Sequence, residues 1–334
     1  MKKKLILIIF ILFLSIFVIG KTIHSFDELL TPERMKIRGN RIFITEEFRV
    51  HIYSLIDFSL IKTIGKKGEG PGEFVGRLYI YPLDDLLYVN SMRKLSVFDK
   101  TGNLLRELRS KDSFANRFKP FNGKFIGQSY EIDKERNRFR LINIYNNDLS
   151  REKIVIREPH MNSFEKGITI FDTTFQVKVL RDKIYVVNGK EFKIDIYDGT
   201  FKKNLVIKKD YNRVKFGKKD KQKAIDNLRS NPQLKSFADE ILKKQKYPDY
   251  YPAIHGLYDN GEYLFVMTYR WKGDNIEFFV FDLSGDFKKQ IFIPFKMKSI
   301  YNAFPWDLKE NKFYQLIENE DEEWELVETE LNLK

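Results

Sequence analysis

The chain contains no cysteine among its 334 residues, and this absence excludes several kinds of site at once. Without a thiol there is no disulfide, no thiolate metal centre and no lipid-modified cysteine. Histidine is scarce as well, since His24, His51, His160 and His255 lie far apart and no two have the spacing of metal ligands on one element. A metal site would therefore need ligands gathered from distant parts of the chain.

Sequence motifs of the common enzyme classes are also missing. The chain has no G-x-S-x-G elbow, no HExxH helix and no dinucleotide-binding fingerprint. The densest acidic run, ENEDEEWE at 318–325, lacks the spacing of a calcium loop and instead predicts a solvated hairpin tip. We therefore expect no cofactor and no metal, and the sequence favours a protein without catalytic activity while leaving that question open.

The N-terminus has the pattern of a secretory signal peptide. Lys2, Lys3 and Lys4 precede an apolar run from Leu5 to Ile19, and Gly20 offers a small residue at a cleavage point. The run is shorter than the roughly twenty residues of a spanning helix. We predict a signal over 1–20, with an uncleaved membrane anchor as the alternative, and a single domain over 21–334. The protein is expected to be periplasmic, on the cell surface or extracellular.

The formal charge of +12 narrows the choice of partners. Removing the three lysines of the signal leaves about +9, which favours anionic glycans, lipid head groups or cell-wall polymers. The alternative is a lysine-rich solvated surface without a specific partner. Nucleic acid is not expected, although RSKDSFANRFK mixes bases with aromatics, because an exported protein seldom meets RNA.

A weak internal repeat runs through the rest of the chain. A branched aliphatic residue, an aromatic residue and Asp or Asn recur together, and the aromatic positions step by 45, 47, 52 and 84 residues. The matches are Val97-Phe98-Asp99, Ile144-Tyr145-Asn146, Ile196-Tyr197-Asp198 and Val280-Phe281-Asp282, with Ile52-Tyr53-Ser54 as a near match. A second short β-type run precedes each match, as RIFI (41–44) and LLYV (86–89) do. After several matches come a turn and a third run. Gly102 and Gly285 stand in two of these turns, where a hairpin needs a residue with a positive φ.

Six such units of about 45 residues, each of three or four antiparallel strands, predict a six-bladed β-propeller. A single unit cannot bury both faces of its sheet, and packing the units around an axis solves that problem. A β-sandwich also has short strands at regular spacing, but it does not require one motif at a fixed long period. We expect residues 22–30, TIHSFDELL, to supply the outer strand that the last unit lacks and so to close the ring.

The glycine-rich stretch IGKKGEGPGEF, residues 64–74, is predicted to connect the first blade to the second. Gly68, Gly70 and Gly72 permit a sharp change of direction, Pro71-Gly72 suits the centre of a type II turn, and Phe74 is expected to insert between the blades. A phosphate-binding loop would need a Lys-Ser/Thr pair followed by a helix, and neither is present.

With the preceding RIFITEEFRVHIYS, the stretch resembles the NHL-type repeat, whose units often end in G-x-G-x-G-P-G-E-F. The wider pattern over about 35–331 is similar to secreted six-bladed propeller proteins, largely uncharacterised, in which a helical insertion and a Tyr-Pro-rich segment precede the fifth blade. The resemblance implies an exported propeller. Some lyases of NHL-like fold hold a metal with histidines in the channel, and this chain shows no such cluster of histidines.

The step of 84 residues predicts a two-helix insertion at about 217–246, between blades 4 and 5. KQKAIDNLRS and NPQLKSFADEILKKQ have helical patterns, and Ser230 or Asn231 is expected to cap the second helix with Pro232 as its first residue. The apolar face of that helix is expected to pack on the propeller near one mouth of the channel. It consists of Leu234, Phe237, Ala238, Ile241 and Leu242.

We predict a binding or interaction module, with an anionic glycan or a protein of the cell envelope as partner. The alternative is a metal-dependent lyase or lactonase with its site in the channel. An enzyme should gather Asp, Glu, Asn or His side chains there, and a binding module should line the channel with aliphatic or small residues. Tyr250, Tyr251 and His255 either face the channel or pack the helices against the fifth blade. The predicted ligand-binding residues, on the face with the blade-joining loops, are Lys66, Lys67, Tyr250, Tyr251, His255 and Arg270.

Overall fold

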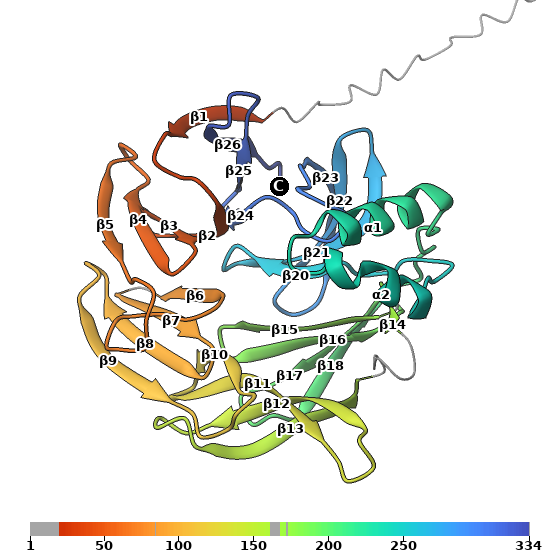
Figure 1. Cartoon of the computed structure of the whole chain (residues 1–334), viewed down its shortest axis with the longest axis horizontal. Coiled ribbons are helices and arrows are strands. Elements are labelled where there is room, and N and C mark those ends of the chain that lie inside the picture. The colour runs from red at the N-terminus through yellow and green to blue at the C-terminus, as the bar shows by residue number, and fades with distance from the viewer. Residues whose placement is uncertain (1–19, 84, 161–167, 172, 334) are drawn as a thin grey trace, which may run out of the picture.

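The computed structural model describes residues 20–83, 85–160, 168–171 and 173–333, so the predicted signal lies outside it except for Gly20. Six four-stranded antiparallel sheets stand around a common axis (Figure 1). The predicted all-β fold, a six-bladed propeller, is therefore confirmed. Neither helix of the described residues is long and apolar enough to cross a membrane.

The strands of each blade follow one another along the chain, except in the last blade. Blade 1 contains β2 (Pro32–Arg38), β3 (Arg41–Glu46), β4 (Arg49–Ser54) and β5 (Leu60–Ile64). Blade 2 contains β6 (Leu78–Leu83), β7 (Leu86–Ser91), β8 (Lys94–Asp99) and β9 (Leu104–Arg109). Blade 3 contains β10 (Asn116–Phe121), β11 (Lys124–Ile132), β12 (Arg138–Tyr145) and β13 (Arg151–Pro159). Blade 4 contains β15 (Thr174–Leu180), β16 (Lys183–Gly189), β17 (Lys193–Tyr197) and β18 (Lys203–Lys208). Blade 5 contains β20 (Gly256–Asp259), β21 (Tyr263–Lys272), β22 (Asn275–Asp282) and β23 (Phe287–Pro294). Blade 6 contains β24 (Trp306–Lys309), β25 (Lys312–Glu318), β26 (Trp324–Glu330) and β1 (Lys21–Phe26).

The first strand of each blade lies nearest the axis and the last lies at the rim (Figure 1). The six inner strands are β2, β6, β10, β15, β20 and β24. Because every inner strand begins where the chain arrives from the previous blade, the connecting segments share one face of the ring. We call it the joining face; it includes residues 65–77, 110–115, 209–255 and 295–305.

The ring is closed by the N-terminal strand, as predicted. β1 pairs antiparallel with β26, from Lys21 opposite Glu328 to Phe26 opposite Trp324, and so forms the outer strand of blade 6. Phe26 is 1% exposed and packs in a cluster that also holds Ile42 and Tyr53 of blade 1. The two ends of the chain are therefore joined by both a strand pairing and a hydrophobic core.

The connection between blades 1 and 2 has the predicted turn. The Glu73 amide donates to the Gly70 carbonyl at 3.1 Å, and Gly72 has a φ of 71°, as the third position of a type II turn requires. Phe74 is fully buried between the two blades, in a cluster with Ile52 and Leu78. The glycine-rich stretch is therefore a structural joint, and a strand, β6, follows it.

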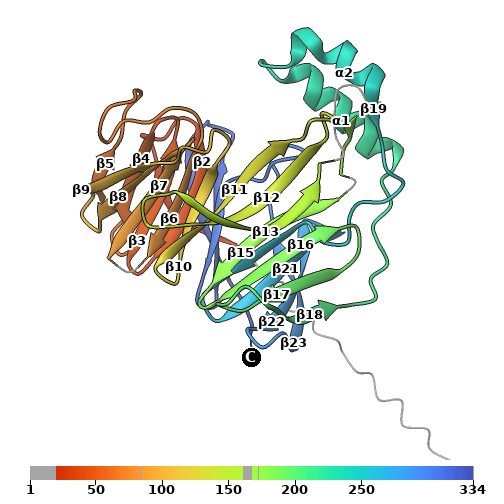
Figure 2. The ribbon, with the colours of Figure 1, turned by 90° about the horizontal axis from the view of Figure 1, so that it is seen from below.

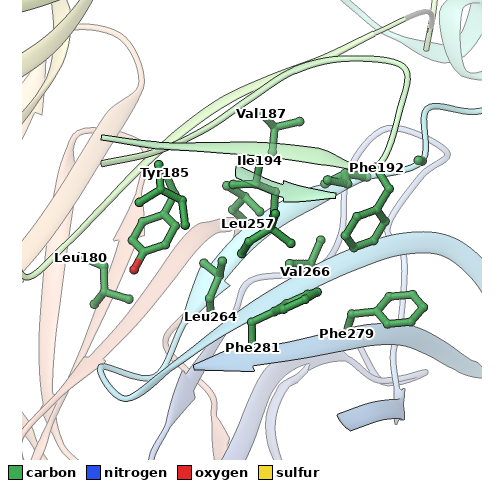
Figure 3. Packing of buried hydrophobic residues seen from close by; sticks show 14 residues of the cluster. Leu180, Tyr185, Val187, Phe192, Ile194, Leu257, Leu264, Val266, Phe279 and Phe281 are labelled. Carbon is green, nitrogen blue, oxygen red and sulfur yellow. The ribbon is translucent and has the colours of Figure 1, made fainter. Parts of the chain in front are cut away.

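Neighbouring blades are held together by apolar side chains from their facing sheets. Alternate residues of a strand point to opposite faces, so each sheet supplies one row of side chains to the blade before it and one to the blade after it. Figure 3 shows such a core, in which Tyr185 and Ile194 of blade 4 face Leu264 and Phe281 of blade 5. Because the faces of the sheets are covered by neighbouring blades, the residues near the axis come from the inner strands.

The helical insertion lies between blades 4 and 5, as predicted, and stands beyond the sheets on one side of the ring (Figure 2). It comprises α1 (Lys218–Ser230), a 3-10 turn (Lys235–Phe237) and α2 (Ala238–Lys244). A short parallel pairing of β14 (Ile168–Thr169) with β19 (Gln245–Lys246) ties its end to the preceding blade connection.

The predicted start of the second helix is wrong. The Asn231 side chain accepts a hydrogen bond from the Gln233 amide at 2.9 Å, which makes a local turn, so α2 begins only at Ala238. Ala238 is buried, but Leu234 is 39% exposed and Phe237 is 57% exposed. The apolar face predicted for this helix is therefore only partly buried.

Candidate functional site

The inner strands share a pattern of alternating residues that turns polar side chains toward the axis. In β2, Met35 and Ile37 are buried in the core between blades 6 and 1, and Arg34 and Lys36 alternate with them. In β6, Leu78 and Ile80 are buried between blades 1 and 2, and the alternate positions are tyrosines. The same alternation in β10 and β15 places further basic side chains, partly buried in the case of Lys119 and Lys178, at the inner edge of the ring.

These side chains contact one another from blade to blade around the axis. We call them the axial cluster, which consists of Arg34, Lys36, Tyr79, Tyr81, Arg117, Lys119, Lys178, Asp259 and Asp307. They come from all six inner strands, so the ring as a whole assembles the site.

The part of the cluster nearest the joining face is built around Tyr79. The guanidinium carbon of Arg34 lies 4.3 Å from the centre of the Tyr79 ring, and that of Arg117 lies 4.6 Å from it. Arg117 Nη2 also donates a hydrogen bond to the Tyr79 hydroxyl oxygen at 2.9 Å. Three successive blades thus place two cations on one aromatic ring.

Two residues farther along each strand lies a second layer of lysines. Lys119 Nζ donates to the Val177 carbonyl at 2.7 Å and lies 5.5 Å from the centre of the Tyr81 ring. Lys178 forms an ion pair with Asp259 of the next blade. This layer therefore links blades 2, 3, 4 and 5.

Asp307, the other carboxylate of the axial cluster, links blade 6 to blade 1. Asp307 Oδ1 accepts a hydrogen bond from Lys36 Nζ at 2.5 Å, and its Oδ2 accepts one from the Ile37 amide at 2.8 Å. Between blades 5 and 6 the contact is aromatic, with the rings of Tyr258 and Trp306 at 4.1 Å.

The axial cluster carries an excess of positive charge. Its five cations face only two carboxylates, and both carboxylates are already engaged by Lys36 and Lys178. Within the described residues, Arg34, Arg117 and Lys119 form no ion pair with a carboxylate, and Arg34 Nε is buried without any hydrogen-bond partner. Three cations of the axial cluster therefore lack a carboxylate partner within the described residues.

The crowding of like charges changes the protonation of the cluster. Burial lowers the pKa of Lys119 to about 7, and the positive charges of Lys178 and Arg117 add to this effect. Burial alone would lower the pKa of Lys178 as well, but the negative charge of Asp259 has the larger effect, so that the pKa of Lys178 is raised. Lys119 is thus the cation of the cluster whose charge changes near neutral pH.

Tyr79 responds to the same charges. Burial raises the pKa of its hydroxyl, but Arg117 and Arg34 outweigh the burial, so that the pKa falls below its ordinary value. Tyr81 lies one layer deeper, and burial raises its pKa. The two tyrosines of one strand therefore differ in their readiness to ionise.

The predicted site residues Lys66 and Lys67 lie on the connection between blades 1 and 2. Lys66 Nζ is 3.2 Å from Glu73 Oε1, and its side chain is 73% exposed. Lys67 Nζ lies 5.7 Å from the centre of the Phe48 ring. Both lysines are on the joining face, but they belong to a blade junction three blades away from the other predicted residues.

Of the predicted residues near blade 5, Tyr251 and His255 are packed inside the protein. Tyr251 is 7% exposed and stacks on Tyr269 at 4.3 Å, and His255 meets the same ring edge-on at 4.7 Å. Burial lowers the pKa of His255 to about 4, and its Nδ1 has no hydrogen-bond partner. With Phe171 and Phe216, these rings fix the helical insertion to blade 5.

The other two predicted residues are more accessible. Tyr250 is 43% exposed, with the guanidinium of Arg213 5.3 Å from its ring centre. Arg270 Nη2 donates to the Asn212 carbonyl at 2.7 Å. The structure thus brings Tyr250, Tyr251, His255 and Arg270 to one side of blade 5 and leaves the lysines of the first joint apart from them.

The two channel linings expected from the sequence are not what the structure shows. Among the described residues there is no cluster of three or more His, Asp or Glu side chains that could hold a metal ion. An aliphatic lining is also wrong, because the axial positions of the inner strands carry arginine, lysine and tyrosine. Residues 319–323 of the acidic run form the turn between β25 and β26, as predicted, whereas Trp324 of the same run is buried in β26.

The axial cluster was missed by the sequence analysis, although its signal is present. The inner strands contain R-x-K at 34–36, Y-x-Y at 79–81 and R-x-K at 117–119, each with a buried apolar residue at its centre. An edge strand that alternates cations with core residues, repeated at the blade period, indicates a basic axis. This pattern is spread across separate blades, so no continuous stretch of the chain contains it.

A separate cavity of about 450 Å³ lies at the junction of blades 6 and 1, on the face opposite the joining face. Apolar side chains of Ile23, Leu55 and Phe58 form one part of its wall. Lys312 and Glu328, which pair at 2.8 Å, form another part. Its charges are balanced, in contrast to those of the axial cluster.

Comparison with known proteins adds no assignment to these sites. No protein-family profile matches the chain, so the resemblance to NHL repeats is not confirmed, and no curated protein matches it either. The chain is similar in fold to a luciferin-regenerating enzyme at 10% identity and a TM-score of 0.48, with 95% of this chain and 96% of that chain covered. It is also similar to the AfRom2 CNH domain at 10% identity and a TM-score of 0.42, with 92% of this chain and 98% of that chain covered. The Pan2 WD40 domain of Neurospora crassa is similar at 7% identity and a TM-score of 0.43, with 91% of this chain and 90% of that chain covered.

Proposed function

We propose that this propeller is a binding module whose axial cluster holds an anionic ligand. The observation that carries the proposal is the group of three cations, Arg34, Arg117 and Lys119, that have no carboxylate partner within the described residues. Arg34 and Lys119 are partly buried, whereas Arg117 is exposed. A buried cation without a counter-charge is costly, and a bound anion removes that cost at Arg34 and Lys119 through charge-assisted hydrogen bonds. The ligand enters from the joining face, where the exposed ion pair of Arg77 with Glu33 precedes Arg34 and Arg117.

The ligand class we favour is an anionic glycan rather than an envelope protein. Tyr79 and Tyr81 stand among the cations, and the rings of Tyr258 and Trp306 contact each other at a tilt on the inner strands β20 and β24, so aromatic rings and charged groups share one site. A sugar acid presents both a carboxylate and an apolar ring face. Inner strands of six blades surround the cluster, a position that a flexible polymer end reaches more readily than a folded domain does.

The cellular setting belongs to the same proposal. If residues 1–20 direct export, acidic polymers of the cell envelope are the anions that the protein meets, and nucleic acid is not. The metal-dependent lyase or lactonase of the sequence analysis finds less support. A divalent cation at the axis would face the five positive charges of the axial cluster, which repel it.

A thermal-shift panel tests the proposal. The ligands are polygalacturonate, alginate and hyaluronan, with methyl-esterified polygalacturonate as the uncharged match, dextran sulfate as a sulfated polymer, and polyuridylate as a nucleic acid. A ligand that binds only the folded state raises the melting temperature. We expect a shift with at least one acidic glycan and none with the ester.

The matched variants are Arg117→Gln in the cluster and Arg106→Gln on the exposed rim strand β9. The first is expected to lose the shift and the second to keep it. Equal shifts in both variants, or a shift with polyuridylate in place of every glycan, would contradict the proposal. A shift with divalent metal that EDTA reverses and the glycans do not compete with would favour the metal-dependent alternative.

A further inference from the structure

Tyr79 has a hydroxyl group that anion binding by itself does not require. Arg34 and Arg117 both lie over its ring, and Arg117 Nη2 donates to its hydroxyl oxygen at 2.9 Å. Positive charges at these positions stabilise the ionised phenolate, and a phenolate is a base. The ring therefore combines a candidate base with two groups that bind carboxylates.

We propose that Tyr79 is a general base for β-elimination in a uronic acid residue bound by Arg34 and Arg117. The inference rests on the proposed function, because the acidic glycan must first bind in the axial cluster. It names the substrate class as a glycan whose uronic acid carries the next sugar on its C4 oxygen. The reaction cleaves that linkage without adding water.

The step balances with the atoms of the substrate and Tyr79 alone. The Tyr79 oxygen accepts the proton from C5 of the uronate, and the two guanidinium groups neutralise the carboxylate as negative charge develops on it. The electron pair of the broken C5–H bond then forms the C4=C5 double bond while the C4–O4 bond breaks. The leaving oxygen takes the proton back from the Tyr79 hydroxyl, which restores the phenolate.

Only one of the two axial tyrosines has the environment for this role. Arg117 and Arg34 outweigh the effect of burial on Tyr79 and keep its pKa below the ordinary value, whereas burial raises the pKa of Tyr81. A base must be ionised, so the rate of elimination should increase with pH up to the pKa of Tyr79. Sulfate groups bind the same cations, but only the carboxylate next to C5 accepts the charge of the transition state.

The experiment measures the ultraviolet absorbance of the unsaturated uronate while the full protein is mixed with the acidic glycan that raises its melting temperature most. Wild type is expected to produce the absorbing product. Tyr79→Phe should lose about 100-fold or more in rate, the usual scale for a general base. Its affinity, measured by calorimetry, should stay within about threefold of wild type, since phenylalanine keeps the ring between the arginines. Tyr130→Phe on β11, with an exposed ring, is the matched control and should keep the full rate.

The outcomes separate the two proposals. A glycan that binds but yields no unsaturated product overturns the elimination and leaves the binding function standing. Product formation that survives in Tyr79→Phe assigns the base to another residue and overturns the role of Tyr79. If no acidic glycan binds at all, the proposed function fails, and this inference fails with it.

Discussion

Single glycines determine how sharply the chain can turn between blades 1 and 2. Gly65 has a φ of 88°, and a Cβ placed on it would lie 2.5 Å from the Phe74 ring and 2.6 Å from the Phe48 carbonyl oxygen. Gly72 has a φ of 71° with nothing within 4 Å of such a Cβ. The two positions have the same backbone restriction and differ in the space around them.

Gly65→Ala is therefore expected to cost more stability than Gly72→Ala. The left-handed backbone costs each variant about 1 kcal/mol, and the overlap with Phe74 and a backbone oxygen adds about 2 kcal/mol at Gly65. Urea unfolding measures both free energies. Equal losses would show that the first joint is not packed as described.

Lys119 gives the axial cluster a pH dependence. Its pKa of about 7, lowered by burial and then by Lys178 and Arg117, means that it is charged below pH 7 and loses that charge as pH rises. The affinity for an acidic glycan should therefore fall about tenfold between roughly pH 6 and pH 8, the scale of one charge-assisted hydrogen bond.

The comparison that checks this role is between Lys119→Met and Lys223→Met, the latter an exposed position of α1. Calorimetric titrations at both pH values should show no change of affinity with pH in the first variant and the wild-type change in the second. A pH dependence that persists without Lys119 would place the titrating group elsewhere.

At the scale of single elements, the inner strands are joined by side chains rather than by backbone pairing. The ion pair of Lys178 on β15 with Asp259 on β20 is the clearest case, with side chains 23% and 16% exposed. Burial alone would raise the pKa of Asp259, but the positive charge of Lys178 has the larger effect, so that the pKa of Asp259 is lowered. A carboxylate with a lowered pKa stabilises the folded state above its unfolded pKa, about 4, and loses that contribution as pH falls through the lower folded value.

Asp259→Asn leaves Lys178 without its partner and should destabilise the protein by about 2 to 3 kcal/mol at neutral pH. The difference from wild type should narrow below about pH 4, where the wild-type pair is lost as well. Glu152→Gln, which breaks a more exposed pair with Lys124, serves as control and should cost under about 1 kcal/mol. A constant difference at all pH values would mean that the pair does not titrate as described.

Elements differ in how well the sequence predicts them. The strands follow from an alternating pattern repeated at the blade period, and the turns at Gly72, Gly102 and Gly285 have the positive φ that their positions require. The second helix of the insertion was placed too early because the Asn231 side chain makes a local turn that competes with a helix cap. A periodic pattern does not show which of two local hydrogen bonds a single side chain will choose.

On the scale of the whole molecule, closure by β1 makes the stability of every blade depend on the first residues of the domain. Phe26 is 1% exposed and its ring lies 4.7 Å from that of Tyr53 in blade 1. Phe26→Ala should cost about 3 to 5 kcal/mol. Because the ring opens as a unit, hydrogen exchange should accelerate in blade 3 as well as in blades 6 and 1.

Lys21→Ala, an exposed change on the same strand, is the control and should leave stability within about 0.5 kcal/mol. Faster exchange confined to blades 6 and 1 would show that the ring does not open cooperatively.

The ring also explains why the fold was predictable and the axial cluster was not. The fold is encoded in a repeat, which can be found along the chain. The cluster is formed by residues that lie between 38 and 81 positions apart from one blade to the next, and no single inner strand differs from an ordinary polar edge strand. Lys66, Lys67, Tyr250, Tyr251, His255 and Arg270 stood out because they are close to conspicuous motifs, and whether they bind a ligand stays a prediction.

The proposed acidic ligand binds at the axis through Arg34 and Arg117. A crystal structure of the protein with the acidic oligosaccharide that raises its melting temperature most would test this claim directly. We predict a carboxylate within hydrogen-bond distance of both guanidinium groups, on the joining-face side of Lys119. A ligand bound instead at Lys66 and Lys67, beside Tyr250, or in the cavity near Phe58 would contradict it.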